Sequence, residues 1–438
     1  MKESVFAFIF LLFFSCEKSD FTIQKNSGNI SFAINYGGSR NDVAKSVTKT
    51  FDGGFAVLGY THSTDGDLEK KNNDSFDYWV LKFDANTDLI WSKTYGGSKD
   101  DRGYDIIETS DNGLAILGFS ESTDENISKN NGLKDFWLAK LDKDGSLLWQ
   151  KNFGFSGNDS GVALTETQDN NLLLSGLLDV TASNGQGNTK KTALKHAGGD
   201  YWVLKISNLG ELIWSKYFGG SLTDTPFGIL ETDSQSSITV GSSDSDDVDI
   251  KNNKGSYDFW IIKLDENGKL LWENSYGGSE IDQAKAIAKN NLNYLIVGDT
   301  RSTDKDILSN YGGADIWIIN INENGELLWE KNIGGSDFDI ANCIKKSIEG
   351  GFILGGSSRS SNGDISKNKG LNDALVLKID EDGILEWELT AGGSALDFIN
   401  DVVQLENGTI IAVGETNSTD GDLKSNAGFS DLLILKID

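Results

Sequence analysis

Hydrophobic and polar residues alternate along this chain in short runs that are separated by glycine-rich or acidic segments. Runs with a period of two predict half-buried β-strands, and tight turns between them predict antiparallel hairpins. One unit shows the order, with strands predicted at 104–109, 114–119, 136–141 and 147–153. A tight Asp-Asn-Gly turn joins the first two strands, a polar loop of about 15 residues joins the next two, and an Asp-Lys-Asp-Gly turn joins the last two.

This four-strand unit is repeated seven times. Each unit starts at a Gly-Gly-Ser motif, and the motifs recur at intervals of 57 to 65 residues. The motifs lie at 37–39, 96–98, 154–156 (degraded to Gly-Phe-Ser), 219–221, 277–279, 334–336 and 392–394. An Asp three residues after each motif is expected to fix the turn between units by accepting backbone amide protons. These residues are Asp42, Asp101, Asp159, Asp224, Asp282, Asp339 and Asp397.

All 11 tryptophans fall at two positions of the unit, in its third and fourth strands. A large ring placed in every sheet is expected to pack against the neighbouring sheet. The chain ends after the third strand of the seventh unit, and residues 30–36 supply a fourth strand ahead of the first unit. A ring of sheets uses this arrangement, because the first strand can complete the last sheet. We therefore predict an all-β fold over residues 30–438: a seven-bladed β-propeller of four-stranded antiparallel blades, closed by the N-terminal strand joining the last blade.

The N-terminal residues predict export of the chain and its attachment to a membrane. Residues 5–14 form an unbroken apolar run, and a helix of ten residues is about half as long as a bilayer core is thick. The run therefore predicts a signal peptide, and its end at Ser15-Cys16 resembles a bacterial lipobox. That resemblance implies a lipoprotein signal peptide at 1–16, acylation (palmitate) of Cys16, a polar tether at 17–29 and attachment to the outer membrane through lipid alone. An ordinary signal peptide with an incidental Cys is the alternative.

Composition argues against several classes of function. Asp and Glu outnumber Lys and Arg by 67 to 39, and the formal charge of −28 repels phosphate, so nucleic-acid binding is not expected. Two Cys and two His are too few to favour a disulfide scaffold, a zinc cluster or a His-based triad. Sialidase-like propellers need three arginines, whereas the four in this chain are spread over four units.

The run KLDENGKLLW at 263–272 is similar to the tryptophan-docking repeat of quinoprotein-like (PQQ-like) propellers. The whole unit resembles propeller repeats of secreted and lipid-anchored proteins of Bacteroidetes, over roughly residues 30–438. Quinoprotein dehydrogenases of that superfamily hold their cofactor beside an adjacent cysteine pair, and the single body cysteine, Cys343, disfavours that activity. Another PQQ-like propeller, the lipoprotein of the outer-membrane barrel-assembly machine, works by contacts alone, which implies a non-enzymatic scaffold.

The long loops between the second and third strands carry Ser-Thr-Asp-x-Asp segments. Carboxylates two residues apart, with loop carbonyls beside them, suit calcium. The alternative is that these side chains bond to nearby amides and fix the turns. The calcium candidates are Asp65, Asp67, Asp304, Asp306, Asp420 and Asp422. No other cofactor is expected.

The loop of the third unit is about seven residues longer than its siblings. An insertion in one repeat often marks a binding face, although plain tolerance of insertion is the alternative. The candidate contact residues are Asn184, Gln186, Lys190, Lys191 and His196. Cys343 aligns with Ser46 of the first unit and is expected to be buried and inert.

These observations favour a non-enzymatic, lipid-anchored envelope scaffold or binding module. We expect it to contact a partner protein or a glycan through the face of the propeller that carries the long loops. The alternative is a carbohydrate-active enzyme that uses carboxylates at the channel mouth. An enzyme is expected to have one unit that gains acids or a nucleophile in its inner strands. The units of this chain instead differ from one another mostly by the loss of repeat residues. No catalytic residue is therefore assigned.

Overall fold

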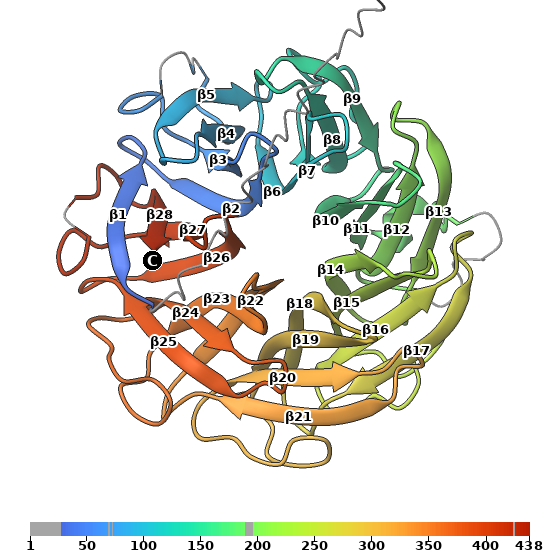
Figure 1. Ribbon diagram of the computed structural model, residues 1–438. Helices are drawn as coiled ribbons and strands as arrows, with labels where there is room; N and C mark the ends of the chain where they lie inside the picture. The colour runs from blue at the N-terminus through green and yellow to red at the C-terminus, as the bar shows by residue number, and fades with distance from the viewer. Residues whose placement is uncertain (1–27, 69–70, 72, 189–195, 424) are drawn as a thin grey trace, which may run out of the picture.

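The computed structural model describes residues 28–68, 71, 73–188, 196–423 and 425–438. Seven four-stranded antiparallel sheets stand around a central axis as the blades of a propeller, with the first strand of each blade innermost (Figure 1). The predicted all-β, seven-bladed fold is confirmed.

Each of the first six blades consists of four strands that follow one another in the chain, and the seventh takes its fourth strand from the N-terminus. The strands are β1 (Ile30–Tyr36), β2 (Asp42–Lys49), β3 (Phe55–Thr61), β4 (Asp77–Phe83), β5 (Leu89–Tyr95), β6 (Asp101–Glu108), β7 (Leu114–Ser120), β8 (Asp135–Leu141), β9 (Leu147–Phe153), β10 (Ser160–Glu166), β11 (Leu172–Leu178), β12 (Asp200–Ile206), β13 (Leu212–Phe218), β14 (Asp224–Glu231), β15 (Ser237–Ser243), β16 (Asp258–Leu264), β17 (Leu270–Tyr276), β18 (Asp282–Asn290), β19 (Asn293–Thr300), β20 (Asp315–Ile321), β21 (Leu327–Ile333), β22 (Asp339–Lys346), β23 (Phe352–Ser358), β24 (Asp373–Ile379), β25 (Leu385–Ala391), β26 (Asp397–Gln404), β27 (Ile410–Thr416) and β28 (Asp431–Ile437).

Strand β1 closes the ring as the outer strand of the last blade (Figure 1). It pairs antiparallel with β28, and Tyr36 lies opposite Leu432. Asn29 and Asp438 add two backbone hydrogen bonds, of 3.2 and 3.0 Å, beyond the end of this pairing. Asn29, the last residue of the predicted tether, therefore already contacts the propeller.

The tryptophans pack in two ways. Those of the third strands are buried, and Trp79 and Trp260 have no exposed surface. Those of the outermost strands are half-buried, and all except Trp387 lie against a glycine in the last turn of the next blade. Gly268 has a φ of +74°, and a Cβ there would lie 2.9 Å from Trp214. The predicted packing role is confirmed, and the close approach explains why this turn uses glycine.

The hydrophobic core is divided among the contacts between neighbouring blades. One cluster joins Trp79 and Leu81 of the first blade to Val413 and Leu432 of the last blade. Six further clusters join the other neighbouring pairs of blades. Because the core lies between sheets, the axis of the ring is left as a channel between the innermost strands.

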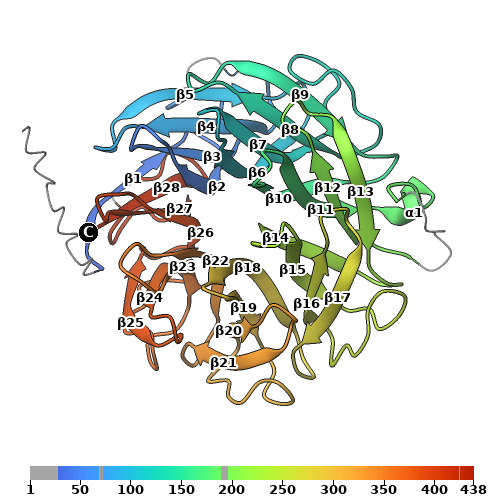
Figure 2. The same cartoon turned by 45° about the vertical axis from the view of Figure 1, so that its right-hand side comes forward.

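A short helix, α1 (Val180–Ser183), departs from the repeat in the enlarged loop of the third unit. Asp179 caps it by accepting a hydrogen bond from the Ala182 amide. Figure 2 shows α1 at the periphery of the ring. No helix in the described part of the chain is long and apolar enough to cross a membrane.

Candidate functional site on the loop face and in the channel

One face of the propeller, which we call the loop face, carries both the Gly-Gly-Ser turns and the long loops. The Asp that follows each Gly-Gly-Ser motif is buried beneath this face. The Oδ2 atom of Asp42 accepts hydrogen bonds from the Gly38 amide at 2.8 Å and from the Ser63 hydroxyl at 2.7 Å. Asp282 makes the corresponding contacts at 2.7 and 2.9 Å. The predicted turn-fixing role therefore matches the geometry.

The calcium candidates use their carboxylate oxygens on the same turns. Asp65 accepts a hydrogen bond from the Ser39 amide at 2.8 Å, which lowers its pKa, and Asp67 accepts one from the Gly37 amide at 2.9 Å. The other candidates accept equivalent amide protons at 2.7 to 3.1 Å: Asp304, Asp306, Asp420 and Asp422. Within the described ranges no three His, Cys, Asp or Glu side chains are grouped to hold a metal ion. These contacts match the alternative to calcium binding, in which the Asp side chains fix the turns by bonding to nearby amides.

Each long loop ends in a buried Asp, which faces the inner-strand Asp of the next blade. Asp258 accepts a hydrogen bond from the Lys254 amide through Oδ2, while its Oδ1 atom has no hydrogen-bond partner. A Cβ on Gly277 would lie 2.3 Å from Oδ1 of Asp258 and 2.7 Å from Oδ2 of Asp282, so the two carboxyl groups meet at this glycine. Burial, assisted by the charge of Asp282, raises the pKa of Asp258 to about 7. The equivalent pairs of Asp carboxyl groups meet in the same way at Gly37, Gly96, Gly219, Gly334 and Gly392.

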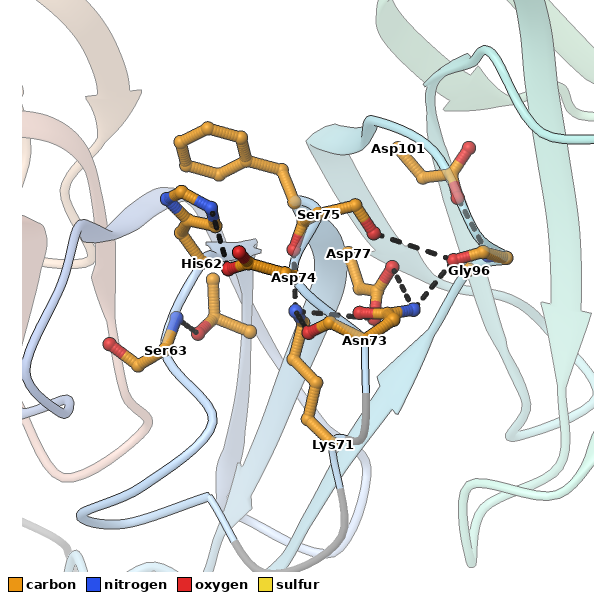
Figure 3. Close-up of polar contacts among 12 residues, drawn as sticks. His62, Ser63, Lys71, Asn73, Asp74, Ser75, Asp77, Gly96 and Asp101 are labelled. Carbon is orange, nitrogen blue, oxygen red and sulfur yellow. Dashed lines mark hydrogen bonds and ion pairs between the residues drawn. The ribbon is translucent and has the colours of Figure 1, made fainter.

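The long loop of the first unit holds a lysine inside it (Figure 3). The Lys71 side chain is 1% exposed and its Nζ atom lies 3.8 Å from the Asp77 carboxylate. Lys71 donates a hydrogen bond to the Asn73 carbonyl at 3.0 Å, and the Asn73 side chain donates to the Gly97 carbonyl at 2.6 Å. Burial lowers the pKa of Lys71 and raises that of Asp77 to about 7. These contacts anchor the loop to the next Gly-Gly-Ser turn.

An aromatic and cationic cluster lies beside this loop, where the channel opens onto the loop face. The Arg102 guanidinium lies 3.9 Å from the ring centre of Phe76 and 5.2 Å from that of Tyr60. Tyr104 lies 6.5 Å from Tyr60, and His62 stacks on Phe76 at 4.6 Å. All five side chains are half-buried. We call these five residues the mouth cluster, which the sequence reasoning missed because they come from separate segments of two units.

The enlarged loop of the third unit forms a separate pocket on the loop face. Asn184 and Gln186 line a cavity of about 360 Å³ together with Phe155 and Ser156 of the degraded motif. Asn184 ends α1 with a φ of +53°, a left-handed conformation that Asn tolerates better than most residues. The structure thus brings two predicted contact residues together at a hollow surface.

His196 is not a surface contact residue, contrary to the prediction. Its side chain is 2% exposed, and its Nδ1 atom pairs with the Asp200 carboxylate at 2.5 Å. The ring also packs edge-on against Tyr217, with 5.1 Å between ring centres. Burial of the loop end therefore gives His196 a role inside the blade. The other two predicted contact residues, Lys190 and Lys191, lie outside the described residues.

The innermost strand of every blade contains a β-bulge at the same place, such as the register shift between Ala44 and Ser46. The extra residue at each bulge lines a central cavity of about 490 Å³. We call these residues the bulge ring, which in order around the axis consists of Lys45, Tyr104, Val162, Phe227, Lys285, Asn342 and Asn400. Unlike the turn residues, they change in character from blade to blade.

Two innermost strands carry a carboxylate in the channel wall. The Ser46 hydroxyl lies 2.9 Å from Asp105 and 3.0 Å from Asp401. Asp105 also accepts a hydrogen bond from the Leu164 amide of the next blade at 2.7 Å, and Asp401 accepts one from the Val47 amide at 3.0 Å. Burial raises the pKa of Asp105 to about 6. The expectation that the units differ mostly by the loss of repeat residues is wrong for these two strands, because each has gained an acid. Both acids can be found in the sequence when the units are aligned at the bulge.

These carboxylates tie neighbouring blades together. Each of their oxygens accepts at least one hydrogen bond from the protein. Lys345 lies 3.5 Å from Asp401, whose charge raises the pKa of that lysine. Cys343 is buried as predicted, and burial raises the pKa of its thiol far above the usual value. The polar groups of the inner wall therefore have evident structural partners.

Comparison with known proteins identifies no family for this chain. No protein-family model matches the chain, and no curated protein sequence matches it. Among solved structures, it is similar to a protein of unknown function from Bacteroides caccae, with 12% identity, a TM-score of 0.37 and coverage of 63% of this chain and 78% of that one. It is also similar to the Pan2 WD40 domain of Neurospora crassa, with 8% identity, a TM-score of 0.46 and coverage of 92% and 95%. A gluconolactonase from Xanthomonas campestris shows 11% identity, a TM-score of 0.40 and coverage of 93% and 89%.

Proposed function

We propose that this protein is a lipid-anchored binding module of the outer membrane, which holds an envelope glycan or partner protein on its loop face without catalysing a reaction. The proposal combines the lipobox-like Cys16 with a rigid ring whose turns are fixed by buried carboxylates. A ring held in this way presents its loop face as a preformed surface, which reduces the entropy lost on binding.

The distribution of arginine carries the proposal. All four arginines of the chain occur at the loop face. Arg40 lies in the first Gly-Gly-Ser turn, Arg102 near the start of β6, and Arg301 and Arg359 directly after β19 and β23. Arginine is enriched at interfaces because its planar guanidinium combines stacking with several hydrogen bonds.

Exposed aromatic residues accompany the arginines. Arg301 and Arg359 lie 5.6 and 5.9 Å from the ring of Phe338, which is itself exposed. Phe429 is 72% exposed and Tyr311 is 58% exposed in other loops of this face. Aromatic side chains are frequent anchors for partner proteins and for sugar rings, and they favour this face as the binding surface.

A carbohydrate-active enzyme remains the second candidate, because Asp105 and Asp401 share Ser46 inside the channel. A carboxyl group with a pKa near 6 can serve as a general acid. Against this, both carboxylates accept amide protons of the next blade, as blade-linking groups do. Turnover on a glycan panel that is abolished in Asp105→Asn would favour the enzyme.

The binding function can be tested by pull-down from solubilised outer membranes together with a glycan panel. We expect the wild-type chain to retain one abundant protein or glycan, and Arg102→Ala to lose it with an unchanged melting temperature. Lys143→Ala is the matched control, because Lys143 is exposed in a turn on the opposite face. If nothing is retained, or if the two variants behave alike, the proposed loop-face function is wrong.

The anchor is tested separately. Cells that express the wild-type chain are expected to incorporate labelled palmitate into it and to carry it in the outer-membrane fraction. Cys16→Ser removes the acylation site and is expected to abolish labelling and membrane association. Membrane association that survives this substitution would contradict lipid anchoring.

A further inference from the structure

The central channel concentrates positive charge inside an acidic protein. Among the described residues, the lining of the cavity includes two aspartates, Asp105 and Asp401, and five lysines. Two of these lysines are ion-paired, Lys345 with Asp401 and Lys289 with Asp233. The whole chain, in contrast, carries a formal charge of −28. Both aspartates are bonded to backbone amides of the next blade. The channel wall therefore offers an anion a more favourable environment than the rest of the surface does.

Two lysines of the bulge ring have no ion-pair partner in the described part of the chain. Lys45 lies 5.8 Å from the ring centre of Tyr60, and Lys285 lies 4.1 Å from that of Phe227. Lys285 donates one hydrogen bond, to the Gln283 side chain at 3.0 Å. Burial lowers the pKa of both lysines, and the more distant charges of Glu415 and Asp299 only partly oppose this. A bound anion would supply a counter-charge within ion-pair distance, which neither lysine has among the described residues.

The rest of the bulge ring is suited to a sugar. Tyr104 and Phe227 provide aromatic rings in the blades next to the two lysines. Asn342 and Asn400 donate hydrogen bonds to Ile399 and Ala44 carbonyls of the next blade, at 2.8 and 2.7 Å. Their side-chain carbonyl oxygens accept no hydrogen bond within the described structure, so they can accept protons from hydroxyl groups. An acidic peptide lacks such a set of hydroxyl donors, whereas a sugar has one at nearly every carbon.

We propose that the bulge ring binds the end of a carboxylate-bearing sugar chain. Carboxylates pair with Lys45 or Lys285, hydroxyl groups donate to Asn342 or Asn400, and a sugar ring packs against Tyr104. The cavity volume of about 490 Å³ falls in the range of roughly 300–1,000 Å³ that is usual for small-ligand sites. This inference rests on the proposed function, because it names a ligand class for the proposed glycan binding and places it in the channel that opens onto the loop face.

Calorimetric titration of the solubilised full chain tests the inference with three probes: tetragalacturonic acid, the neutral galactotetraose and tetraglutamate. We expect the uronate to bind most tightly, and its affinity to fall with added salt. Lys45→Met and Lys285→Met keep the aliphatic stem and remove the charge, and each is expected to weaken uronate binding about tenfold or more. Arginine at either position is expected to retain binding, and Lys143→Met on the opposite face serves as the control.

Val162→Glu gives an independent check that leaves both lysines in place. It adds a negative charge to the same ring and is expected to weaken uronate binding, whereas Val162→Gln is not. Equal binding of galactotetraose or tetraglutamate, or indifference of uronate binding to Lys45→Met and Lys285→Met, would overturn the inference. Absence of uronate binding would also overturn it, while a partner retained in the pull-down would leave the proposed loop-face function standing.

Discussion

Ser46 is the residue at which the chemistry of the channel wall is most constrained. Its hydroxyl has one proton, yet it lies within hydrogen-bond distance of two carboxyl groups, Asp105 and Asp401. One proton can be donated to only one of them at a time, so the hydroxyl is shared between the two carboxylates. Burial raises the pKa of Asp105 to about 6, although the hydrogen bond from Ser46 opposes this shift.

We predict that Ser46→Ala raises the pKa of Asp105 above 6, because the hydrogen bond from Ser46 favours the ionised form. The free energy of unfolding at pH 7 should fall by about 1–2 kcal/mol, since a buried hydrogen bond is lost. Carboxyl carbon NMR titration and urea denaturation measure the two effects. Thr64→Ala, at an exposed loop position, is the control and should change neither quantity. An unchanged Asp105 titration would refute the role of Ser46.

The acidic loop residues lead to a second prediction at this scale. Asp65 and Asp67 accept amide protons of the Gly-Gly-Ser turn, so turn geometry does not require a cation. Excess chelator should therefore leave the melting temperature unchanged. Asp65→Ala, in contrast, should lower the free energy of unfolding, because it removes the acceptor of the Ser39 amide proton. A drop in melting temperature on chelation that calcium reverses would restore the calcium hypothesis.

At the scale of the element, the blade is a sheet that is stable only with neighbours on both sides. In five blades a third-strand tryptophan is buried in the blade contact, and in six blades a fourth-strand tryptophan lies on a glycine that follows in the ring. The contact between Trp387 and Gly28 makes this arrangement continuous across the closure. Strand β1 is thus the element that turns an array of sheets into a ring.

Deletion of residues 1–36 is expected to lower the free energy of unfolding by more than about 3 kcal/mol. It removes β1 and leaves β28, with the buried Leu433 and Leu435, as an open edge. Deletion of residues 1–27 is the matched control and should leave stability unchanged. Chemical denaturation measures both, and similar stability of the two truncated chains would contradict closure by β1.

The whole molecule contains a ring of buried carboxyl groups beneath the loop face. Burial raises the pKa values of Asp77, Asp224 and Asp258 to about 7. A carboxyl group whose pKa is raised on folding binds its proton more tightly in the native state. Its contribution to stability is therefore complete below the ordinary pKa near 4 and is lost as the pH rises toward 7.

Other carboxyl groups act in the opposite direction at lower pH. Although partial burial opposes it, hydrogen bonds from Lys140 and Thr109 lower the pKa of Asp111 to about 2. This contribution is present above pH 4 and is lost as the pH falls toward 2. We therefore predict maximum thermal stability between about pH 4 and 6, with a lower melting temperature at pH 8. Calorimetric scans from pH 3 to 9 measure the profile, and a maximum at pH 8 would contradict it.

Asp258→Asn isolates one member of the buried ring. It removes a buried charge that is unfavourable at pH 8. The difference in the free energy of unfolding between pH 5.5 and 8 should therefore shrink by an amount on the order of 1 kcal/mol. Asp144→Asn is the control, because Asp144 is exposed in a turn on the opposite face. If both variants keep the wild-type slope, the buried ring does not govern the pH dependence.

Local alternation and repeats at regular intervals were enough to predict the strands, their turns, the number of blades and the use of β1. The sequence also indicated the turn-fixing Asp residues, since their partners lie within one or two loops of the chain. The burial of His196 against Asp200 was not evident, because burial depends on how the loop packs over the sheet.

The side chains that meet at the axis became evident from the folded ring and not from the repeat pattern. A bulge of one residue directs Lys45, Tyr104 and Lys285 into the channel wall, and ring closure brings Asp401 to Ser46 across 355 positions of the chain. Alternation predicts which face of a strand is buried, but it carries no information on contacts between separate blades. Such contacts arise from closure of the whole ring, and no local pattern encodes them.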